Sequence, residues 1–196
     1  AHLVEDQLKV FTEAGYKVKF DVLNAADFGV AQERRRILIV GIRDDIDHEY
    51  HFPQPTHGEG RANPKTTIHD AISDLPEWPE GEFYDRDFHW YYMSRDRRND
   101  WDETSRTIVA NPRHMPLHPI SPKMVKVEHN VWKFETEDRA RRFTYREAAR
   151  LQGFAKDFTF PETENASLDM KYKVAGNAVP PPLFEAVARA LPPIWD

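Results

Sequence analysis

Three arginines, Arg34, Arg35 and Arg36, stand directly before a short apolar run at 37–42. Alternate side chains of an extended segment point to the same side, so Gln32, Arg34 and Arg36 are expected to project together. Guanidinium groups on one side, at the edge of a strand, suit a phosphate or a carbonyl oxygen, because they offer paired N–H donors. A solvated basic cluster is the alternative interpretation.

A second candidate site lies near the C-terminus, where the chain reads Gly-Asn-Ala-Val-Pro-Pro over residues 176–181. A glycine-asparagine turn before a proline-started helix would leave backbone N–H groups free at the helix N-terminus. Such groups suit a carboxylate or phosphate oxygen. The apolar positions that follow predict a helix from about Leu183 to Leu191. A plain helix entry without a ligand is the alternative.

A third segment, residues 142–154, contains the signature of a capped helix. Thr144 is the expected N-cap, and Glu147 stands three residues later, which together make a capping box. The helix is expected to end before Gly153. Taken singly, this segment is typical of a core helix.

The remaining sequence predicts the elements that hold these segments. Apolar spacing predicts a helix over 3–14, and Gly15 is a natural stop. Alternation over 16–22 predicts a half-buried strand, and the run 37–42 predicts a buried one. This order indicates an α/β protein. Residues 44–65 are expected to form a linker, 66–75 a short helix, 76–140 an irregular module and 155–170 a loop.

Composition excludes several classes of protein. The 196 residues contain no cysteine, so this chain itself holds no disulfide, thiolate metal site or cysteine nucleophile. The histidines lack metal-ligand spacing, and no metal site is expected. No apolar run approaches the ~20 residues of a membrane span, and no secretory signal is visible, so a cytoplasmic protein is expected.

The charge is unevenly distributed along the chain. The net charge is −6, but residues 94–150 alone carry +4, whereas residues 1–93 carry −8 and residues 151–196 carry −2. A basic centre between acidic ends could direct a polyanion to one face. An ordinary mixed surface is the alternative.

Taken together and in this order, the three segments resemble the C-terminal half of DNA (cytosine-5) methyltransferases. Gln32-x-Arg34-x-Arg36 is similar to that family's eighth conserved block. Residues 142–154 resemble the ninth, although Ala155 stands where proline is usual, and residues 173–181 resemble the tenth. The resemblance implies part of a Rossmann-like methyltransferase fold, of α/β class. It assigns 1–45 and 141–196 to the catalytic domain and 46–140 to an inserted target recognition domain.

The central module resembles bacterial methylases that modify GGCC within restriction-modification systems. The similarity lies in residues 94–98, 101–103, 107–110, 113 and 117–119. Guanine accepts bidentate arginine at O6 and N7, so the candidates for base reading are Arg95, Arg97, Arg98 and Arg113. The expected phosphate contacts are Lys123, Lys126 and Lys133. Double-stranded DNA is the implied partner.

The resemblance also implies a reaction that this chain only partly supports. In the family, the target cytosine is flipped out of the duplex, a cysteine attacks C6, a glutamate engages N3, and C5 takes a methyl group from S-adenosylmethionine. The blocks carrying that cysteine (Pro-Cys) and glutamate (Glu-Asn-Val), like the glycine-rich cofactor block, are not in this sequence. The chain is therefore expected to need a complementary N-terminal half, in the same chain or a separate subunit.

The same resemblance gives roles to the residues that are present. Arg36 would contact the O2 side of the flipped cytosine, with Arg34 and Gln32 supporting the loop. The segment of Asn177, Ala178 and Val179 would close over the methionine end of the cofactor. The alternative function is a non-catalytic DNA-binding module that keeps the recognition fold.

Overall fold

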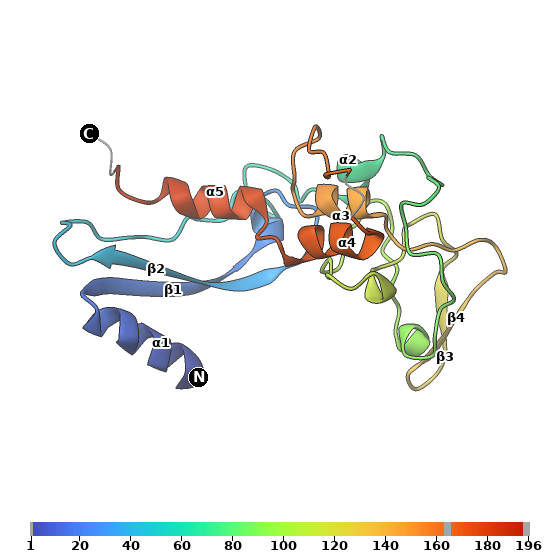
Figure 1. The fold of residues 1–196 in the computed structure, drawn as a ribbon, viewed down its shortest axis with the longest axis horizontal. Coiled ribbons are helices and arrows are strands. Elements are labelled where there is room, and N and C mark those ends of the chain that lie inside the picture. The colour runs from blue at the N-terminus through green and yellow to red at the C-terminus, as the bar shows by residue number, and fades with distance from the viewer. Residues whose placement is uncertain (1, 163–165, 194–196) are drawn as a thin grey trace.

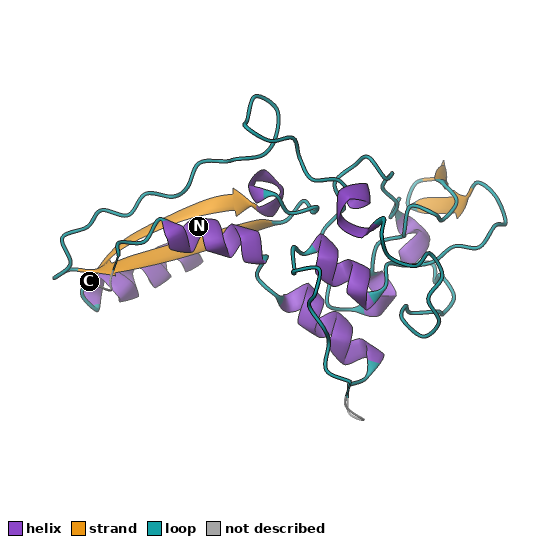
Figure 2. Ribbon diagram, turned by 90° about the horizontal axis from the view of Figure 1, so that it is seen from above, coloured by secondary structure: helices purple, strands orange, loops and turns teal. Residues whose placement is uncertain are grey.

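The computed structural model describes residues 2–162 and 166–193, and it consists of an extended arm joined to a compact body (Figures 1 and 2). The arm contains α1 (His2–Glu13), β1 (Tyr16–Asn24), β2 (Arg35–Arg43) and α5 (Pro181–Arg189). The body contains α2 (Ile68–Ile72), α3 (Tyr145–Leu151), α4 (Leu168–Asn177) and the hairpin of β3 (Met124–Glu128) and β4 (Val131–Phe134). None of the described helices is long and apolar enough to cross a membrane.

The arm is built on an antiparallel ribbon. Gly15, at φ 86°, turns the chain from α1 into β1, which pairs with β2 over its full length. The 3-10 turn η1 (Ala25–Phe28) follows β1, and the chain then leads into β2. The predicted helix and two strands are confirmed.

The two faces of this ribbon are covered unequally. Leu38 and Ile42 pack with Leu183 and Val187 of α5, which lies along that face (Figure 1). The opposite face is apolar and largely open: Phe20, Val22, Ile37 and Ile39 are 38–53% exposed. The prediction of a buried strand over 37–42 is therefore wrong, because alternate side chains of β2 point to this largely open face.

The body has one main core, to which distant segments contribute. Ile68 of α2, Ile108 and Met115 of the irregular module, and Phe143 and Tyr172 near α3 and α4 belong to the same buried cluster. Residues on both sides of position 140 thus share a core. The division into domains at 45 and 140 stays a prediction, and the packing is continuous across the second boundary.

The predicted capping box of α3 and the predicted turn at residues 176 and 177 have different outcomes. The capping box at α3 is confirmed: Thr144 Oγ1 accepts the Glu147 N–H at 3.0 Å, and the Glu147 carboxylate accepts the Thr144 N–H at 2.7 Å. The expected glycine-asparagine turn is wrong, because α4 begins at Leu168 and runs through Gly176 to Asn177.

The α3 cap is also the centre of a buried charged cluster. Arg141 binds both Glu147 carboxylate oxygens at 2.8 Å, and each residue is 1% exposed. His118 lies beside them, with Nε2 3.5 Å from Glu147, and its Nδ1 accepts the Ile120 N–H. Burial, with the charges of Arg141 and Arg98, lowers the pKa of His118 to about 3, so its ring is neutral. The cluster joins the irregular module to α3.

Candidate functional site

Gln32 brings the three sequence blocks together where the arm meets the body. Its side chain is fully buried, and Nε2 donates to the Gln152 side chain, just after α3. Gln152 in turn donates to the Ala178 carbonyl, beyond α4. The Gln32 side-chain oxygen accepts the Ile108 N–H at 2.7 Å. One side chain thus connects the β2 entry with α3 and the irregular module.

Arg34 crosses the same junction. It is 5% exposed, and its guanidinium donates to the Ile108 carbonyl at 2.8 Å and to the Gly176 carbonyl at 2.9 Å. Burial, together with the charge of Arg36, lowers the pKa of Arg34 to about 10, which leaves it charged at neutral pH. All of these acceptors are backbone carbonyls, so Arg34 holds the junction together.

Arg36 differs from these two buried residues in its exposure. It is on β2 opposite Leu23, its side chain is exposed, and one of its nitrogens donates to the Arg35 carbonyl at 2.7 Å. The prediction that Gln32, Arg34 and Arg36 project together is wrong for Arg36. β2 begins at Arg35 and leaves the body there, whereas Gln32 and Arg34 precede the strand and remain inside the junction.

Gly176 marks the closest approach in this junction. A Cβ at this position would lie 2.4 Å from the Val109 carbonyl carbon and 2.4 Å from the Ala110 nitrogen. Both atoms are backbone and belong to the segment that Gln32 and Arg34 hold in place. Glycine is needed here because α4 packs directly on another main chain.

We expect Gly176→Ala to destabilise the protein by about 1–3 kcal/mol, because the added methyl group must push two backbones apart. The control is Gly41→Ala on β2, where a Cβ would meet only the Tyr16 side chain at 3.4 Å. Urea denaturation of both variants measures the difference. Equal stabilities for Gly176→Ala and Gly41→Ala would contradict the close packing.

The link from α4 to α5 carries the candidate cofactor residues. Asn177 and Val179 are exposed, whereas Ala178 is half-buried and its carbonyl is taken by Gln152. The predicted set of free N–H donors at the start of α5 is wrong. The N-cap is Pro180, and the first two helical residues are also prolines, none of which has an N–H.

Two candidate base-reading arginines have exposed side chains. Arg95 donates to the Tyr91 hydroxyl at 3.0 Å, with its guanidinium 5.5 Å from the centre of that ring. Arg113, beside the 3-10 turn η3 (Pro112–His114), donates from Nε to the Tyr84 hydroxyl at 3.1 Å. Each keeps guanidinium nitrogens that could bind a ligand.

Arg97 and Arg98 are held by the protein itself. Arg97 is 9% exposed, and its guanidinium donates to backbone carbonyls, with the shortest bond at 2.8 Å to Tyr92 of the 3-10 turn η2 (Tyr92–Ser94). Arg98 donates to two carbonyls and to the Asp100 carboxylate. Base reading by these two residues stays a prediction. The three candidate phosphate-binding lysines, Lys123, Lys126 and Lys133, are exposed on or beside the β3–β4 hairpin.

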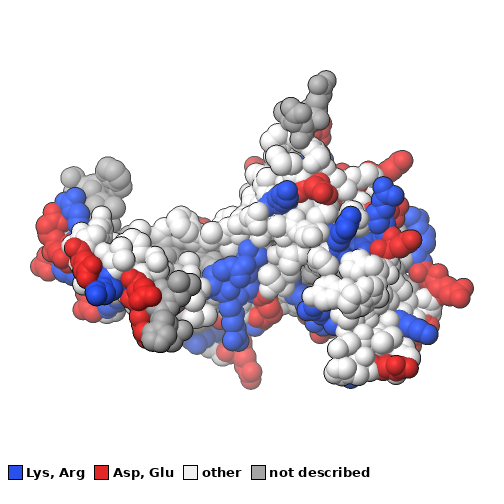
Figure 3. All heavy atoms as spheres, turned by 60° about the horizontal axis from the view of Figure 1, so that its bottom comes forward, with Lys and Arg blue, Asp and Glu red and all other residues white. Residues whose placement is uncertain are grey.

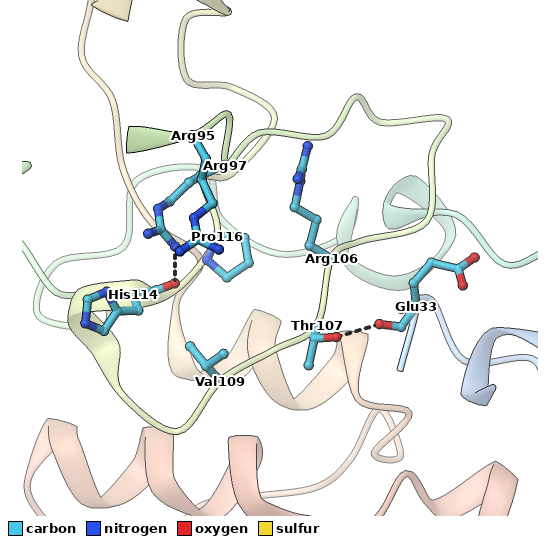
Figure 4. Close-up of a pocket in the computed structure, with 8 residues that line it drawn as sticks. All are labelled: Glu33, Arg95, Arg97, Arg106, Thr107, Val109, His114 and Pro116. Carbon is cyan, nitrogen blue, oxygen red and sulfur yellow. Dashed lines mark hydrogen bonds between the residues drawn. The ribbon is translucent and has the colours of Figure 1, made fainter. Parts of the chain in front are cut away.

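A cavity of about 440 Å³ lies among these arginines (Figure 4). It is lined by Glu33, Arg95, Arg97, Arg106, Thr107, Val109, His114 and Pro116. Arg106 is not among the site residues predicted from sequence. Two features of the sequence could have indicated this residue: it belongs to the basic stretch 94–150, and it directly precedes the segment 107–110, which resembles the family. No three His, Asp or Glu side chains group as a metal site among residues 2–162 and 166–193.

The family is decided by comparison with known sequences. The model of the C-5 cytosine-specific DNA methylases matches residues 1–192. The chain belongs to this family. Among curated proteins, it is 42% identical over 194 residues to the Type II methyltransferase M.BsuRI of Bacillus subtilis, covering 95% of the chain and 43% of that protein.

A second relative agrees with the first. The chain is 40% identical to the Type II methyltransferase M.MthTI of Methanothermobacter thermautotrophicus, covering 92% of the chain and 58% of that protein. The chain therefore spans about half the length of the methyltransferases it matches.

Solved structures confirm the fold. A Spodoptera frugiperda DNMT2 variant superimposes with a TM-score of 0.66 at 13% identity, over 97% of this chain and 62% of that one. Dnmt2 of S. pombe gives 0.63 at 16% identity, over 96% and 61%. The predicted α/β methyltransferase fold is thus correct for this cytosine-5 methylase chain.

Proposed function

We propose that this chain works within an enzyme that methylates C5 of cytosine in duplex DNA, as part of a restriction-modification system. The proposal is supported by the hydrogen-bonded junction between the arm and the body. Gln32, Gln152 and Ala178, one from each of the three family blocks, form a chain of hydrogen bonds that also holds Ile108 of the irregular module. Such bonding fixes the arm and the arginine-rich module in one geometry, as joint handling of a base and its flanking DNA requires.

The reacting cysteine and glutamate would come from a complementary half. The support is the open face of the ribbon, where Phe20, Val22, Ile37 and Ile39 are exposed. Beside it, a cavity of about 570 Å³ is lined mainly by apolar side chains of α1, β1 and β2. Contiguous apolar surface of this kind marks a contact with another protein part. That half, in the same chain or another, would cover this face.

S-adenosylmethionine is the proposed cofactor, and it supplies the methyl group. The α4–α5 link fits one edge of such a site. Asn177 offers exposed amide donors and acceptors, which suit the charged amino-acid end of the molecule, and Val179 is an exposed apolar side chain, 52% accessible. These two residues would hold and cover the cofactor's methionine end, and the rest of the site would lie in the other half.

Arg36 and the two exposed arginines Arg95 and Arg113 would contact different parts of the DNA. The Arg36 guanidinium has N–H donors beyond its bond to Arg35, and it would hold the O2 side of a flipped cytosine. Arg95 and Arg113 would read guanines through O6 and N7, which favours a GC-rich site such as GGCC. Arg34 would keep the β2 entry in position.

The proposal is tested by complementation. The purified chain is mixed with an N-terminal half that carries the Pro-Cys and Glu-Asn-Val blocks, a GGCC duplex and methyl-labelled S-adenosylmethionine. Label is expected on C5 of cytosine, and only with both halves present. The control duplex has the same composition with its GGCC site scrambled.

The outcomes separate the two candidate functions. Salt-dependent DNA binding without methylation, under any complementation, would favour the non-catalytic module. Equal labelling of both duplexes would keep the activity and reject the GGCC site.

A further inference from the structure

The segment of residues 105–108 in the irregular module is anchored by several hydrogen bonds to residues 31–34. The Glu33 N–H donates to the Ser105 carbonyl at 2.8 Å, and the Ser105 N–H donates to the Ala31 carbonyl at 3.0 Å. Thr107 Oγ1 donates to the Glu33 carbonyl at 2.7 Å. Ile108 is held at both backbone groups by Gln32 and Arg34. The main chain on both sides of residue 106 is therefore fixed to the arm.

Arg106 is the one side chain of this segment that is exposed. Figure 4 shows it reaching into the cavity, with Arg95 and Arg97 across from it and Glu33 to one side. Within the described ranges, 2–162 and 166–193, its guanidinium has no hydrogen bond, ion pair or ring contact. A rigid backbone thus presents an unused guanidinium, which is the arrangement of a prepared binding site.

The side chains that line the cavity carry a net positive charge, which favours binding of an anion. Three arginines line it against a single carboxylate, and that carboxylate is already engaged: Glu33 binds Lys65 at 2.6 Å and also accepts from Asn24. A space-filling view shows Lys and Arg side chains gathered where the arm meets the body (Figure 3). A bound anion would relieve the repulsion among these guanidiniums.

The arrangement favours a phosphate over a base edge. Guanidiniums enter the cavity from the anchored segment on one side and from Arg95 and Arg97 on the other (Figure 4). A phosphate can accept hydrogen bonds from several directions, whereas a guanine edge takes a single planar fork from one arginine. The volume of about 440 Å³ leaves room for a phosphate with its neighbouring sugars.

We propose that Arg106 binds a backbone phosphate of the target DNA and so fixes the duplex against the junction between arm and body. This inference rests on the proposed function, because it takes DNA as the substrate. It adds a positioning contact that does not depend on the DNA sequence, at a residue that the sequence motifs did not single out.

The test is a DNA-binding titration of the complemented enzyme, in its wild-type form and with Arg106→Ala in this chain. Fluorescein-labelled duplexes with a GGCC site or a scrambled site are titrated, and anisotropy is recorded from 50 to 200 mM salt. Arg106→Ala is expected to weaken binding about tenfold on both duplexes and to reduce the slope of log K against log salt by about 0.9, one phosphate contact. Arg106→Lys is expected to keep the slope.

The matched control is Arg189→Ala, which removes an exposed arginine of α5 whose side chain, within the described part of the chain, is bound only to Glu185. It is expected to leave affinity and slope unchanged, and thermal melting checks that every variant is folded. Loss confined to the GGCC duplex would overturn the phosphate assignment in favour of base reading. Unchanged binding by Arg106→Ala would also overturn the phosphate assignment. In that case DNA binding by the wild type would still support DNA as the substrate. A complemented wild-type enzyme that binds neither duplex would overturn both proposals.

Discussion

Replacing Arg141 with methionine is expected to lower the free energy of unfolding by about 3–5 kcal/mol, because the change leaves a buried carboxylate without its partner. Glu147 is 1% exposed, and Arg141 supplies hydrogen bonds to both of its oxygens. In the wild-type protein the His118 ring beside Glu147 is neutral, because burial, with the charges of Arg141 and Arg98, lowers its pKa to about 3, so Arg141 is the cation that pairs with this carboxylate. The Thr144 N–H also binds Glu147, so the cap of α3 is disturbed with the ion pair.

Denaturation in urea at pH 7 measures this effect. Arg189→Met is the matched control, because Arg189 pairs with Glu185 at the surface, where the two side chains are 77% and 60% exposed. That control is expected to cost less than about 0.5 kcal/mol. The double variant Arg141→Met/Glu147→Met should recover much of the loss, since no unpaired charge then remains. Similar losses for Arg141→Met and Arg189→Met would show that the buried pair contributes little.

The secondary structure of the arm and the α3 cap could be predicted because local signals decide them. Gly15, the alternation in β1 and the capping box of Thr144 and Glu147 act within a few residues. The exposure of Ile37 and Ile39 could not be predicted in this way. Strand patterns indicate which side chains are apolar, but whether they are covered depends on what packs against them.

The site was predicted less completely than the fold, for a physical reason. Gln32 and Arg34 are predicted from the family resemblance to support the loop, but their partners Gln152, Ile108 and Gly176 lie 74 to 142 residues away in sequence. No periodicity reports such contacts. The glycine at position 176 predicts a turn, because glycine commonly occurs where the backbone needs an unusual conformation. In the structure its missing side chain instead allows α4 to pack against the backbone of Val109 and Ala110.

Which arginines keep free donors cannot be predicted from sequence, because the exposure and the hydrogen bonds of each guanidinium depend on the fold. The sequence does not distinguish Arg97 from Arg106, because both are arginines in the same basic stretch. One gives its donors to the backbone around Tyr92, and the other gives them to no described residue. A candidate DNA contact needs free donors at the surface, and that property emerges only from the folded chain.

Arg36→Ala is expected to reduce methyl transfer by the complemented enzyme about 10²–10³-fold, the loss typical of a removed donor to developing charge. Stability should change by no more than about 0.5 kcal/mol, since Arg36 is exposed and its hydrogen bond to Arg35 is local. The control is Arg43→Ala at the far end of β2, where the arginine binds Asp45 and is 63% exposed.

The contrast within the motif makes this prediction specific. Arg34 is buried and holds Ile108 and Gly176, so its loss would appear in stability and in activity together. Arg36 is exposed just beyond the junction, so its loss should appear in the single-turnover rate while DNA affinity and the urea midpoint stay close to wild type. Arg36→Ala with full activity would contradict the proposed contact with the flipped base. Parallel losses of rate and stability would place Arg36 with Arg34, among the residues that hold the junction.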